Sequence, residues 1–471
     1  MIFERISSPG LAHFSYLIGD QDEGICAVID PRRDIAVYLE LARRYGVRIG
    51  WILETHIHAD FVSGSRELAH RTGAPIGVGA AGEYGFEHHP LAEGDTITLG
   101  SLTLTVLHTP GHTPEHISFL IGGGSGAEQP WGLFTGDTLF AGEVGRPDLI
   151  DGQEETLARQ LYHTLHDKLL PLGDGIVIYP AHGSGSPCGA SIGDRLTSTI
   201  GYERQHNAAL QAQTEDDFVQ QILGQLSPAP AYYPRLKQIN ARGPHVLGEV
   251  PYLAPLSVDE FRREMQQPNT LVLDTREIEA FGGAHIPGSL NIALRDPFPI
   301  WVGRVVEAGQ RILLVLPDDS QLDQARRDLL SVGYENLAGY LRQGFRRWSE
   351  GGQPFARIEQ ISVHELKAYI DAEDGFQVLD TRSDEEWQQG HIPTARHIFV
   401  PELPARMHEL DCEQPVAVYC GSGYRASIAA SLLARGGFRQ VYNVPGSMTA
   451  WQAAGYPLTG DGTRRQSRRD W

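Results

Sequence analysis

The chain has 471 residues, and we expect about two to four domains, because single cores rarely grow beyond roughly 250 residues. A formal charge of −20 argues against nucleic acid or an anionic membrane as a partner, since phosphates attract clustered Lys and Arg. Four cysteines without paired spacing predict reduced thiols rather than a disulfide framework. No secretory pattern is visible, and no apolar run approaches the roughly 18–20 residues of a membrane span, so we expect a cytoplasmic protein.

Strands and helices alternate through the first half of the chain. Two short strands are expected between Phe14 and Asp30, followed by a helix over residues 35–45. Residues 49–53 form an apolar run typical of a buried strand, and a second helix is expected over residues 65–71. This alternation predicts a layered α/β domain.

The turn that follows residues 49–53 carries three potential metal ligands. It reads THIHAD over residues 55–60 and contains His56, His58 and Asp60. Strand side chains repeat every two residues, so the two histidines share a face if the strand persists. Two imidazoles and a carboxylate this close are costly to bury unless a cation or hydrogen bonds satisfy them. The pattern therefore predicts a metal site.

Three further strand ends close on His or Asp. They contribute His112 after the strand at residues 102–107, and then Asp137 and His182. Gly111 lets the backbone turn tightly, so that the next side chain can point inward. Four such strand ends predict a shared site far more strongly than any one of them.

Four motifs, THIHAD, TPGHTPEH, TGDTLF and YPAHGSG, resemble the successive metal-site motifs of the metallo-β-lactamase superfamily. The resemblance covers about residues 1–245 and implies an αββα sandwich with the metal at one edge of the two sheets. Members of this superfamily are mostly zinc hydrolases, so the fold alone does not decide the chemistry.

One position departs from the pattern of the two-metal members. These carry a histidine directly after the aspartate, whereas this chain has Phe61 after Asp60. A phenyl ring cannot bind a metal, and it takes the room of a second hydrated ion. We therefore expect one mononuclear site.

Within the superfamily, the chain resembles the persulfide dioxygenases, also called sulfur dioxygenases. That resemblance implies that His56, His112 and Asp137 hold Fe(II), as in the two-histidine, one-carboxylate triad of non-haem iron oxygenases. Zinc is an alternative metal for the same residues. The other motif residues would then hydrogen-bond bound ligands or water, and they are His58, Asp60 and His182.

Three more residues are candidates near the metal. The segment GRPD at residues 145–148 and the helix that follows it also resemble this subgroup, so Arg146 and Tyr162 are candidates for binding the carboxylate of a thiol such as glutathione. A structural ion pair and a packed ring are the alternatives for these two. Cys188, in a Gly/Ser-rich loop after His182, could relay a sulfane sulfur or be a spectator thiol.

The second half of the chain contains an internal repeat. LVLDTR at residues 271–276 recurs as QVLDTR at residues 377–382, and AHIP at residues 284–287 recurs as GHIP at residues 390–393. These motifs resemble rhodanese domains, so the second half resembles a tandem rhodanese. Such domains are small α/β domains with a parallel sheet flanked by helices.

The second copy carries a candidate nucleophile. A strand at residues 415–419 opens into Cys420, and Arg425 follows after four residues, the spacing of rhodanese sulfurtransferases. The intervening persulfide loop consists of Gly421, Ser422, Gly423 and Tyr424. A Gly-rich loop that runs into a helix presents successive N–H groups to an anion, and with Arg425 it would stabilise a thiolate or persulfide.

The first copy lacks this chemistry. Its corresponding strand, residues 312–315, is followed by LPDDSQ, which has no thiol and no Arg. Two acids there would repel an anionic sulfur species. We therefore predict a catalytically inactive domain.

Along essentially the whole chain, this order of domains resembles the multidomain persulfide dioxygenase–sulfurtransferases. The resemblance implies that O2 oxidises a low-molecular-weight persulfide, such as glutathione persulfide, to sulfite, and that Cys420 carries sulfur between persulfide, sulfite and thiosulfate in sulfide detoxification. The carrier thiol and the direction of transfer stay open, and we expect a homo-oligomer. The predicted domains are a dioxygenase over residues 1–245, an inactive rhodanese-like domain over residues 246–355 and an active rhodanese over residues 356–471.

Two alternatives come from other classes. The main one is a zinc-dependent thioester hydrolase of the glyoxalase II kind, with an accessory sulfurtransferase and a metal-bound hydroxide as nucleophile. Phe61 and the fused rhodanese weigh against it. A sulfide-sensing module with vestigial catalysis is the other, but the ligand set and Cys420 are both complete.

Overall fold

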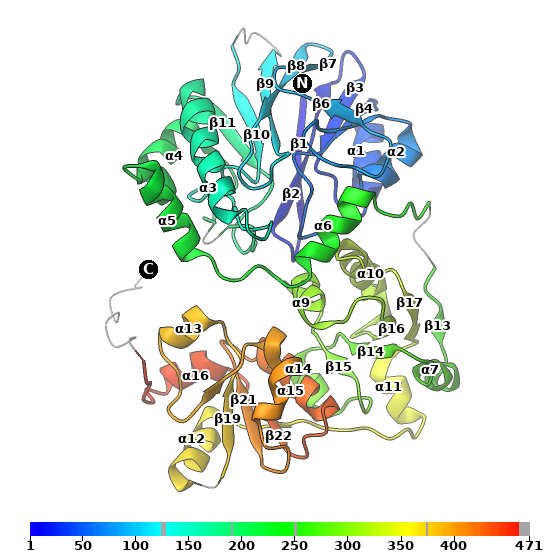
Figure 1. The fold of residues 1–471 in the computed structure, drawn as a ribbon. Helices are drawn as coiled ribbons and strands as arrows, with labels where there is room; N and C mark the ends of the chain where they lie inside the picture. The colour runs from blue at the N-terminus through cyan, green and yellow to red at the C-terminus, as the bar shows by residue number, and fades with distance from the viewer. Residues whose placement is uncertain (124–128, 190–191, 249–251, 374, 461–471) are drawn as a thin grey trace. The chain divides into compact units, whose positions relative to one another are not determined.

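The computed structural model describes residues 1–123, 129–189, 192–248, 252–373 and 375–460. Two compact units are distinguished within it (Figure 1). The first comprises residues 1–251 and 327–333, and the second comprises residues 252–326 and 334–471.

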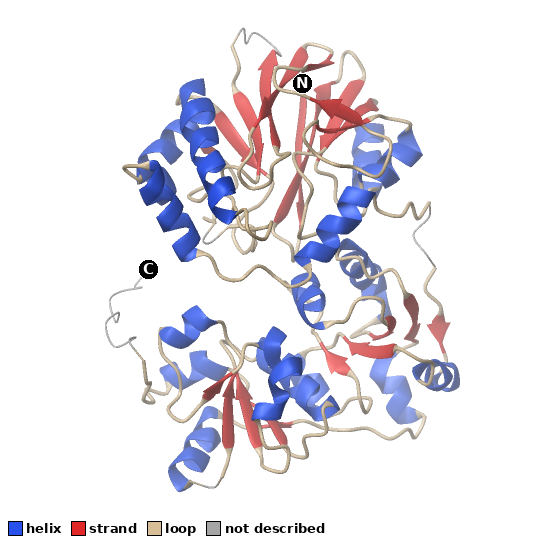
Figure 2. Cartoon of the chain, viewed as in Figure 1, coloured by secondary structure: helices blue, strands red, loops and turns tan. Residues whose placement is uncertain are grey.

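The first unit is a sandwich of two mixed six-stranded sheets (Figure 2). The first sheet follows chain order with β1 (Ile2–Ser8), β2 (His13–Asp20), β3 (Ile25–Ile29), β4 (Arg48–Leu53), β5 (Ile76–Gly79) and β6 (His89–Leu91). The second runs in the order β12 (Ser198–Thr199), β11 (Val177–Pro180), β10 (Gly132–Gly136), β9 (Ile117–Gly123), β8 (Leu102–His108) and β7 (Thr96–Leu99). Strands β3 to β6 pair in parallel, as do β10 and β11, so the ends of β4, β10 and β11 can deliver functional loops.

Apolar side chains fill the space between the two sheets. The buried cluster includes Tyr16 and Leu53 from the first sheet, and Val106, Phe119 and Phe134 from the second. The same strands also present apolar side chains outward, because successive side chains point to opposite faces. Each outer face therefore needs a cover of helices, which produces the four-layer αββα arrangement.

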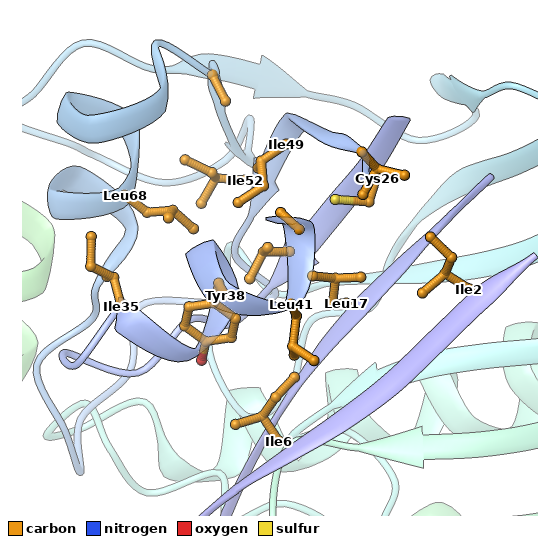
Figure 3. Packing of buried hydrophobic residues seen from close by; sticks show 14 of the residues in the cluster. Ile2, Ile6, Leu17, Cys26, Ile35, Tyr38, Leu41, Ile49, Ile52 and Leu68 are labelled. Carbon is orange, nitrogen blue, oxygen red and sulfur yellow. The ribbon is translucent and has the colours of Figure 1, made fainter. Parts of the chain in front are cut away.

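Helices α1 (Ala36–Tyr45) and α2 (Ser65–Thr72) cover the outer face of the first sheet. In Figure 3, Tyr38 and Leu41 of α1 pack towards Leu17 of β2 and Ile6 of β1. The second sheet is covered by α3 (Glu154–His163), α4 (Ile200–His206) and α5 (Glu215–Gln225). The remaining helical segments of this unit are η1 (Thr164–Leu169), η2 (Leu170–Leu172), η3 (Ala208–Gln211) and α6 (Tyr233–Arg242).

The second unit contains two five-stranded sheets whose paired strands are all parallel. The first sheet has the order β13 (Pro255–Leu256), β17 (Leu337–Leu341), β16 (Arg311–Val315), β14 (Thr270–Asp274) and β15 (Leu290–Asn291). The second repeats it with β18 (Glu359–Gln360), β22 (Val441–Asn443), β21 (Val416–Tyr419), β19 (Gln377–Asp380) and β20 (Arg396–His397).

Parallel neighbours require crossover connections, and helices provide them. The first of these domains contains α7 (Val258–Met265), α8 (Ile278–Gly283), α9 (Phe298–Val305), η4 (Asp319–Gln321), α10 (Leu322–Ser331) and α11 (Gly344–Glu350). The second contains α12 (Val363–Ala372), α13 (Asp384–Gln388), η5 (Val400–Glu402), α14 (Leu403–Arg406), η6 (Met407–Glu409), α15 (Tyr424–Arg435) and α16 (Ser447–Ala453).

The predicted fold class is confirmed. The helix expected over residues 35–45 is α1, which ends at Gly46 with a left-handed φ of 67°, and residues 49–53 lie within β4. The predicted boundaries after residues 245 and 355 lie between elements and stay predictions. Among the helices that the structure describes, none has the length and apolar character that crossing a membrane requires.

Candidate functional site

The loop between β4 and α2 carries His56, and hydrogen bonds anchor its start. The N–H and Oγ1 of Thr55 donate to the two carboxylate oxygens of Asp30, over 2.7 and 2.9 Å. The N–H of Ile57 donates to the carboxylate of Glu115 over 2.9 Å. Because the loop is buried, these bonds supply the partners that regular secondary structure would otherwise provide.

The structure brings His56, His112 and Asp137 together. One ligand atom from each lies within 4.8 Å of the others, and all three side chains are buried. The Nε2 atoms of His56 and His112 lie 3.6 and 3.5 Å from Asp137 Oδ2. Gly111 has a φ of 143°, and a Cβ there would lie 2.5 Å from Leu161 Cα, so glycine is required for His112 to turn inward.

The donor atoms of these residues fit a metal ion. Among the described residues, Asp137 Oδ2 is buried without a hydrogen-bond partner. Nδ1 of His112 donates to the carbonyl of Arg146 over 2.8 Å, which leaves its Nε2 as the lone-pair atom beside Asp137. Burial lowers the pKa of His56 and of His112, so both rings are neutral at pH 7 and able to ligate. A cation here would satisfy the orphaned carboxylate oxygen.

His58 is held by two carboxylates that the sequence analysis did not single out. Its Nε2 lies 3.1 Å from Asp30 Oδ1 and 3.2 Å from Glu54 Oε2. Burial opposes the charged ring, but the two carboxylates raise the pKa of His58 well above its usual value. The three residues form a further buried group of possible metal ligands. The only sequence signal is that Asp30 follows β3 and Glu54 follows β4.

His182 joins the metal triad to Asp60. Its Nδ1 donates to Asp137 Oδ1 over 2.7 Å, and its Nε2 lies 2.8 Å from Asp60 Oδ2. Burial would lower its pKa, but Asp137 and Asp60 raise the pKa of His182 to about 10. Burial would raise the pKa of Asp137, but His182 and the neighbouring histidines hold it below its usual range. His182 therefore orients Asp137 so that Oδ2 faces His56 and His112, and its predicted role at the metal stays a prediction.

Cys188 is buried in the same region. It forms a group of possible ligands with Asp60 and His182, and its Sγ lies 3.8 Å from the hydroxyl of Tyr233. Burial and the carboxylates of Asp60 and Asp137 raise the pKa of the Cys188 thiol well above its usual value. The sulfur-relay role and the spectator role both stay predictions. The four cysteines, all of which are described, form no disulfide.

Phe61, which we predicted to take the room of a second metal ion, packs against two histidine rings. It is fully buried, with its ring centroid 4.1 Å from that of His13 and 4.5 Å from that of His58. The position that carries a ligand in two-metal relatives is thus filled by an apolar ring. The expectation of a single ion stays a prediction, because Asp60, His182 and Cys188 offer three donors close by.

Asn240 of α6 holds the loop between β4 and α2 (residues 55–63, called the metal loop below). The sequence analysis did not identify this residue. Its side-chain N–H groups donate to the carbonyls of His58 and Phe61, each over 2.7 Å, and its Oδ1 accepts the Ser63 N–H over 2.9 Å. No local pattern points to this residue, because it lies 182 positions along the chain from His58.

Arg146 and Tyr162 have partners within the first unit. The guanidinium of Arg146 donates twice to Asp148, over 2.7 and 2.8 Å, and also to the carbonyls of Pro187 and Ser227. The half-buried ring of Tyr162 lies 5.5 Å from that of Phe218. These contacts match the structural alternative for both residues, and their predicted role in binding substrate stays untested.

The cysteine loop of the last domain lies at the end of β21. Cys420 is buried, its N–H donates to Ser447 Oγ over 3.0 Å, and its Sγ accepts the N–H of Gly423 over 3.1 Å. Gly423 has a φ of 114°, which lets the loop turn directly into α15. The sulfur therefore lies beside the N-terminus of α15 and accepts one loop N–H, and the anion-binding role of the loop stays a prediction.

Arg425 is paired with an acid that the sequence analysis did not identify. Its NH1 and NH2 donate to the two carboxylate oxygens of Glu386 over 2.5 and 2.7 Å. Burial opposes the charge, but Glu386 and Cys420 raise the pKa of Arg425. In the first copy, β16 runs into residues 316–321, where Asp318 accepts a hydrogen bond from the N–H of Ser320, and this loop offers neither thiol nor guanidinium.

Comparisons with known proteins define the class. Residues 8–182 match the metallo-beta-lactamase superfamily, and residues 257–351 and 362–454 each match the rhodanese-like domain. A probable metallo-hydrolase of Burkholderia pseudomallei is 32% identical over 46% of this chain and 84% of its own length. The mitochondrial persulfide dioxygenase ETHE1 of Homo sapiens is 32% identical over 49% of this chain and 84% of its own length.

A solved structure covers more of the chain. It is a metallo-β-lactamase of Staphylococcus aureus, 35% identical, which covers 73% of this chain and 99% of its own, with a TM-score of 0.66. The protein therefore belongs to the metallo-β-lactamase superfamily and carries two rhodanese-like domains. The two relatives, a hydrolase and a dioxygenase, are equally similar, so they define the class of metal-dependent enzyme and not the reaction.

Proposed function

We propose that the first unit is a persulfide dioxygenase and that the last domain is a sulfurtransferase. The observation that carries the proposal is the buried group of His56, His112 and Asp137, in which one unpartnered carboxylate oxygen faces two neutral imidazoles. Two histidines and one carboxylate on one side of an ion are the ligand set of non-haem Fe(II) oxygenases. A rhodanese-like domain in the same chain adds a site for sulfur carriers.

The proposed substrate is a low-molecular-weight persulfide, RSSH, such as glutathione persulfide. With one O2 and one water it gives RSH, sulfite and two protons, and the sulfane sulfur loses the four electrons that O2 gains. Fe(II) held by the triad would supply the redox chemistry. The chain itself orients the ligands through Thr55, the Arg146 carbonyl and His182, and the buried ring of Phe61 packs against His58.

The last domain would move sulfane sulfur through Cys420. The thiolate attacks the outer sulfur of thiosulfate, one S–S bond breaks as another forms, and sulfite leaves. In the reverse direction, sulfite takes the sulfur from the Cys420 persulfide and thiosulfate leaves. The N–H of Gly423 donates to Cys420 Sγ, which carries the negative charge in the thiolate form. Placing both sites in one chain raises the effective concentration of the sulfite that they share.

A zinc-dependent thioester hydrolase is the second candidate. The observation that favours it is the group formed by Asp60, His182 and Cys188, which could hold a second ion beside the triad. Metal content separates the two proposals, because a dioxygenase of this kind needs one iron per chain, whereas a two-metal hydrolase binds two zinc ions.

Oxygen uptake tests the dioxygenase. Protein loaded anaerobically with Fe(II) should consume O2 when glutathione persulfide is added, and sulfite or thiosulfate should appear. His112→Ala should abolish uptake, since it removes one of three ligands, whereas His70→Ala, on the exposed face of α2, should not change it. No uptake by the iron-loaded protein with several persulfides would exclude the proposal and make thioesters the next substrates to try.

The division of labour between the two sites can be tested by Cys420→Ser. This variant should lose transfer of sulfur from thiosulfate to an acceptor, because the hydroxyl cannot carry a persulfide. Its O2 uptake with glutathione persulfide should stay within about twofold of the unmodified protein, because Cys420 belongs to a separate unit. Loss of both activities together would contradict a two-site protein.

A further inference from the structure

The acid that pairs with Arg425 lies beside the cysteine loop. Glu386 belongs to α13, and its carboxylate holds the guanidinium through two parallel hydrogen bonds. A Cβ built on Gly421 would lie 3.1 Å from Arg425 NH2 and 3.8 Å from Glu386 Oε1, so the carboxylate borders the loop itself. The side chain of Glu386 is 34% exposed and that of Arg425 is 19% exposed, so the pair is open to the solvent from which an anion arrives.

Of the two rhodanese-like domains, only the copy that carries the cysteine also carries the Glu386–Arg425 pair. Glu386 lies four residues after the arginine of the second DTR motif, and the corresponding residue of the first copy is Ala280. The first copy also lacks the cysteine and the arginine of the loop. The acid is therefore not required to form the rhodanese-like fold, which both copies adopt.

The carboxylate cancels the charge that would otherwise attract a dianion. A bidentate pair of this kind occupies the face of the guanidinium that could bind a sulfonate in the same way. The N–H of Gly423 and the start of α15 still favour one negative charge on the Cys420 sulfur. A second negative charge arriving with thiosulfate or sulfate would enter the loop that the Glu386 carboxylate borders, and like charges repel.

We propose that Glu386 is a specificity-determining residue that weakens the binding of small dianions at the cysteine loop. The proposal rests on the sulfurtransferase function proposed for this domain. The loop would then favour a persulfide, whose sulfur carries a single charge, over thiosulfate as donor. When thiosulfate is the product, it would leave readily and would inhibit weakly.

The first measurement does not depend on turnover. Cys420 is alkylated with iodoacetamide in the full-length protein, and peptide mass spectrometry separates it from the exposed Cys412. Sulfate, an unreactive dianion, is the protecting probe. In Glu386→Gln, sulfate should protect Cys420 from alkylation at a roughly tenfold lower concentration than in the unmodified protein. One opposing charge is gone, while a hydrogen-bond acceptor for Arg425 remains. Glu385→Gln removes the same charge from the exposed neighbouring residue and should behave as the unmodified protein.

The second measurement is donor selectivity. Glu386→Gln should lower the KM for thiosulfate by about tenfold and should change the KM for glutathione persulfide by less than about threefold. Glu386→Asp keeps the charge and should not lower the KM for thiosulfate. If Glu386 only supported the fold, its replacement would change the KM for thiosulfate and the KM for glutathione persulfide by similar factors.

The outcomes are distinct. Unchanged or weaker protection by sulfate in Glu386→Gln overturns the proposal, and so does an equal effect of Glu385→Gln. Absence of transfer in the unmodified protein with either donor would count against the sulfurtransferase function, and the alkylation experiment would still decide the role of Glu386.

Discussion

The amide of Asn240 replaces regular secondary structure in the metal loop. The loop from Thr55 to Ser63 is buried, and its carbonyls and N–H groups need partners inside the protein. Asn240 supplies three of them with one side chain, two as donor and one as acceptor. Because these bonds hold the backbone on both sides of Asp60, they fix the direction in which the ligand-bearing part of the loop faces.

Replacing Asn240 with Ala should therefore reduce metal binding. Two buried carbonyls and one N–H would lose their partner, which costs roughly 3 kcal/mol of stability, and residues that orient metal ligands typically change affinity by roughly 10–100-fold. Bound iron after dialysis and the melting temperature report the two effects. Gln238→Ala, on the exposed side of the same helix, should leave both unchanged. Full iron binding by Asn240→Ala would show that the loop holds its conformation without the amide.

At the scale of elements, helix α15 has a buried polar face. Tyr424, Ser427 and Ser431 recur at spacings of three and four, so they share one side of the helix. That side meets the first rhodanese-like domain, where Ser427 Oγ donates to Asn291 Oδ1 over 2.6 Å and the Tyr424 hydroxyl donates to the Ala293 carbonyl over 3.0 Å. The first rhodanese-like domain thus supports the helix that begins at the cysteine loop.

Asn291→Ala tests this support. It should destabilise the second unit by about 2 kcal/mol, because the Ser427 hydroxyl and the carbonyls of Asp274 and Arg276 lose their partner. We also expect slower sulfur transfer by Cys420 with unchanged O2 uptake, measured in the same preparation. Asn336→Ala, an exposed asparagine of the same domain, is the control. Normal transfer at a lowered melting temperature would mean that the contact stabilises the helix without affecting the loop.

For the whole molecule, the two units have separate hydrophobic cores. The ligand groups described above all belong to the first unit, and the cysteine loop belongs to the second. A metal that binds only the folded first unit stabilises that unit by mass action and leaves the other unchanged.

Metal removal should consequently affect one part of the thermal unfolding. Calorimetry should resolve two unfolding transitions. Iron at about 100 times its dissociation constant should raise the midpoint temperature of one of them by roughly 5–10 °C, since binding adds about 2.7 kcal/mol to the free energy of unfolding. Chelation should reverse the shift, and His112→Ala should remove it. A shift of both transitions, or of neither, would contradict a single metal site confined to the first unit.

Most of the correct predictions of elements and ligand positions came from the spacing of residues within short segments of the sequence. Strands, their alternation with helices and the strand-end positions of His56, His112 and Asp137 follow from periods of two and from turn residues such as Gly111. Comparison of the repeated motifs was enough to indicate two rhodanese-like domains and to separate the copy with Cys420 from the copy without it.

The partners of these residues were decided by the tertiary structure. Asn240 lies on a helix far along the chain from the loop that it holds, and Glu386 lies 39 positions before Arg425 on a different helix. Asp30 and Glu54 meet at His58 because β3 and β4 are neighbours in one sheet. Periodicity reports only which face of its own element a side chain occupies. Which other element covers that face depends on how the sheets and helices pack, and this packing determines the charge and hydrogen bonds around each reactive group.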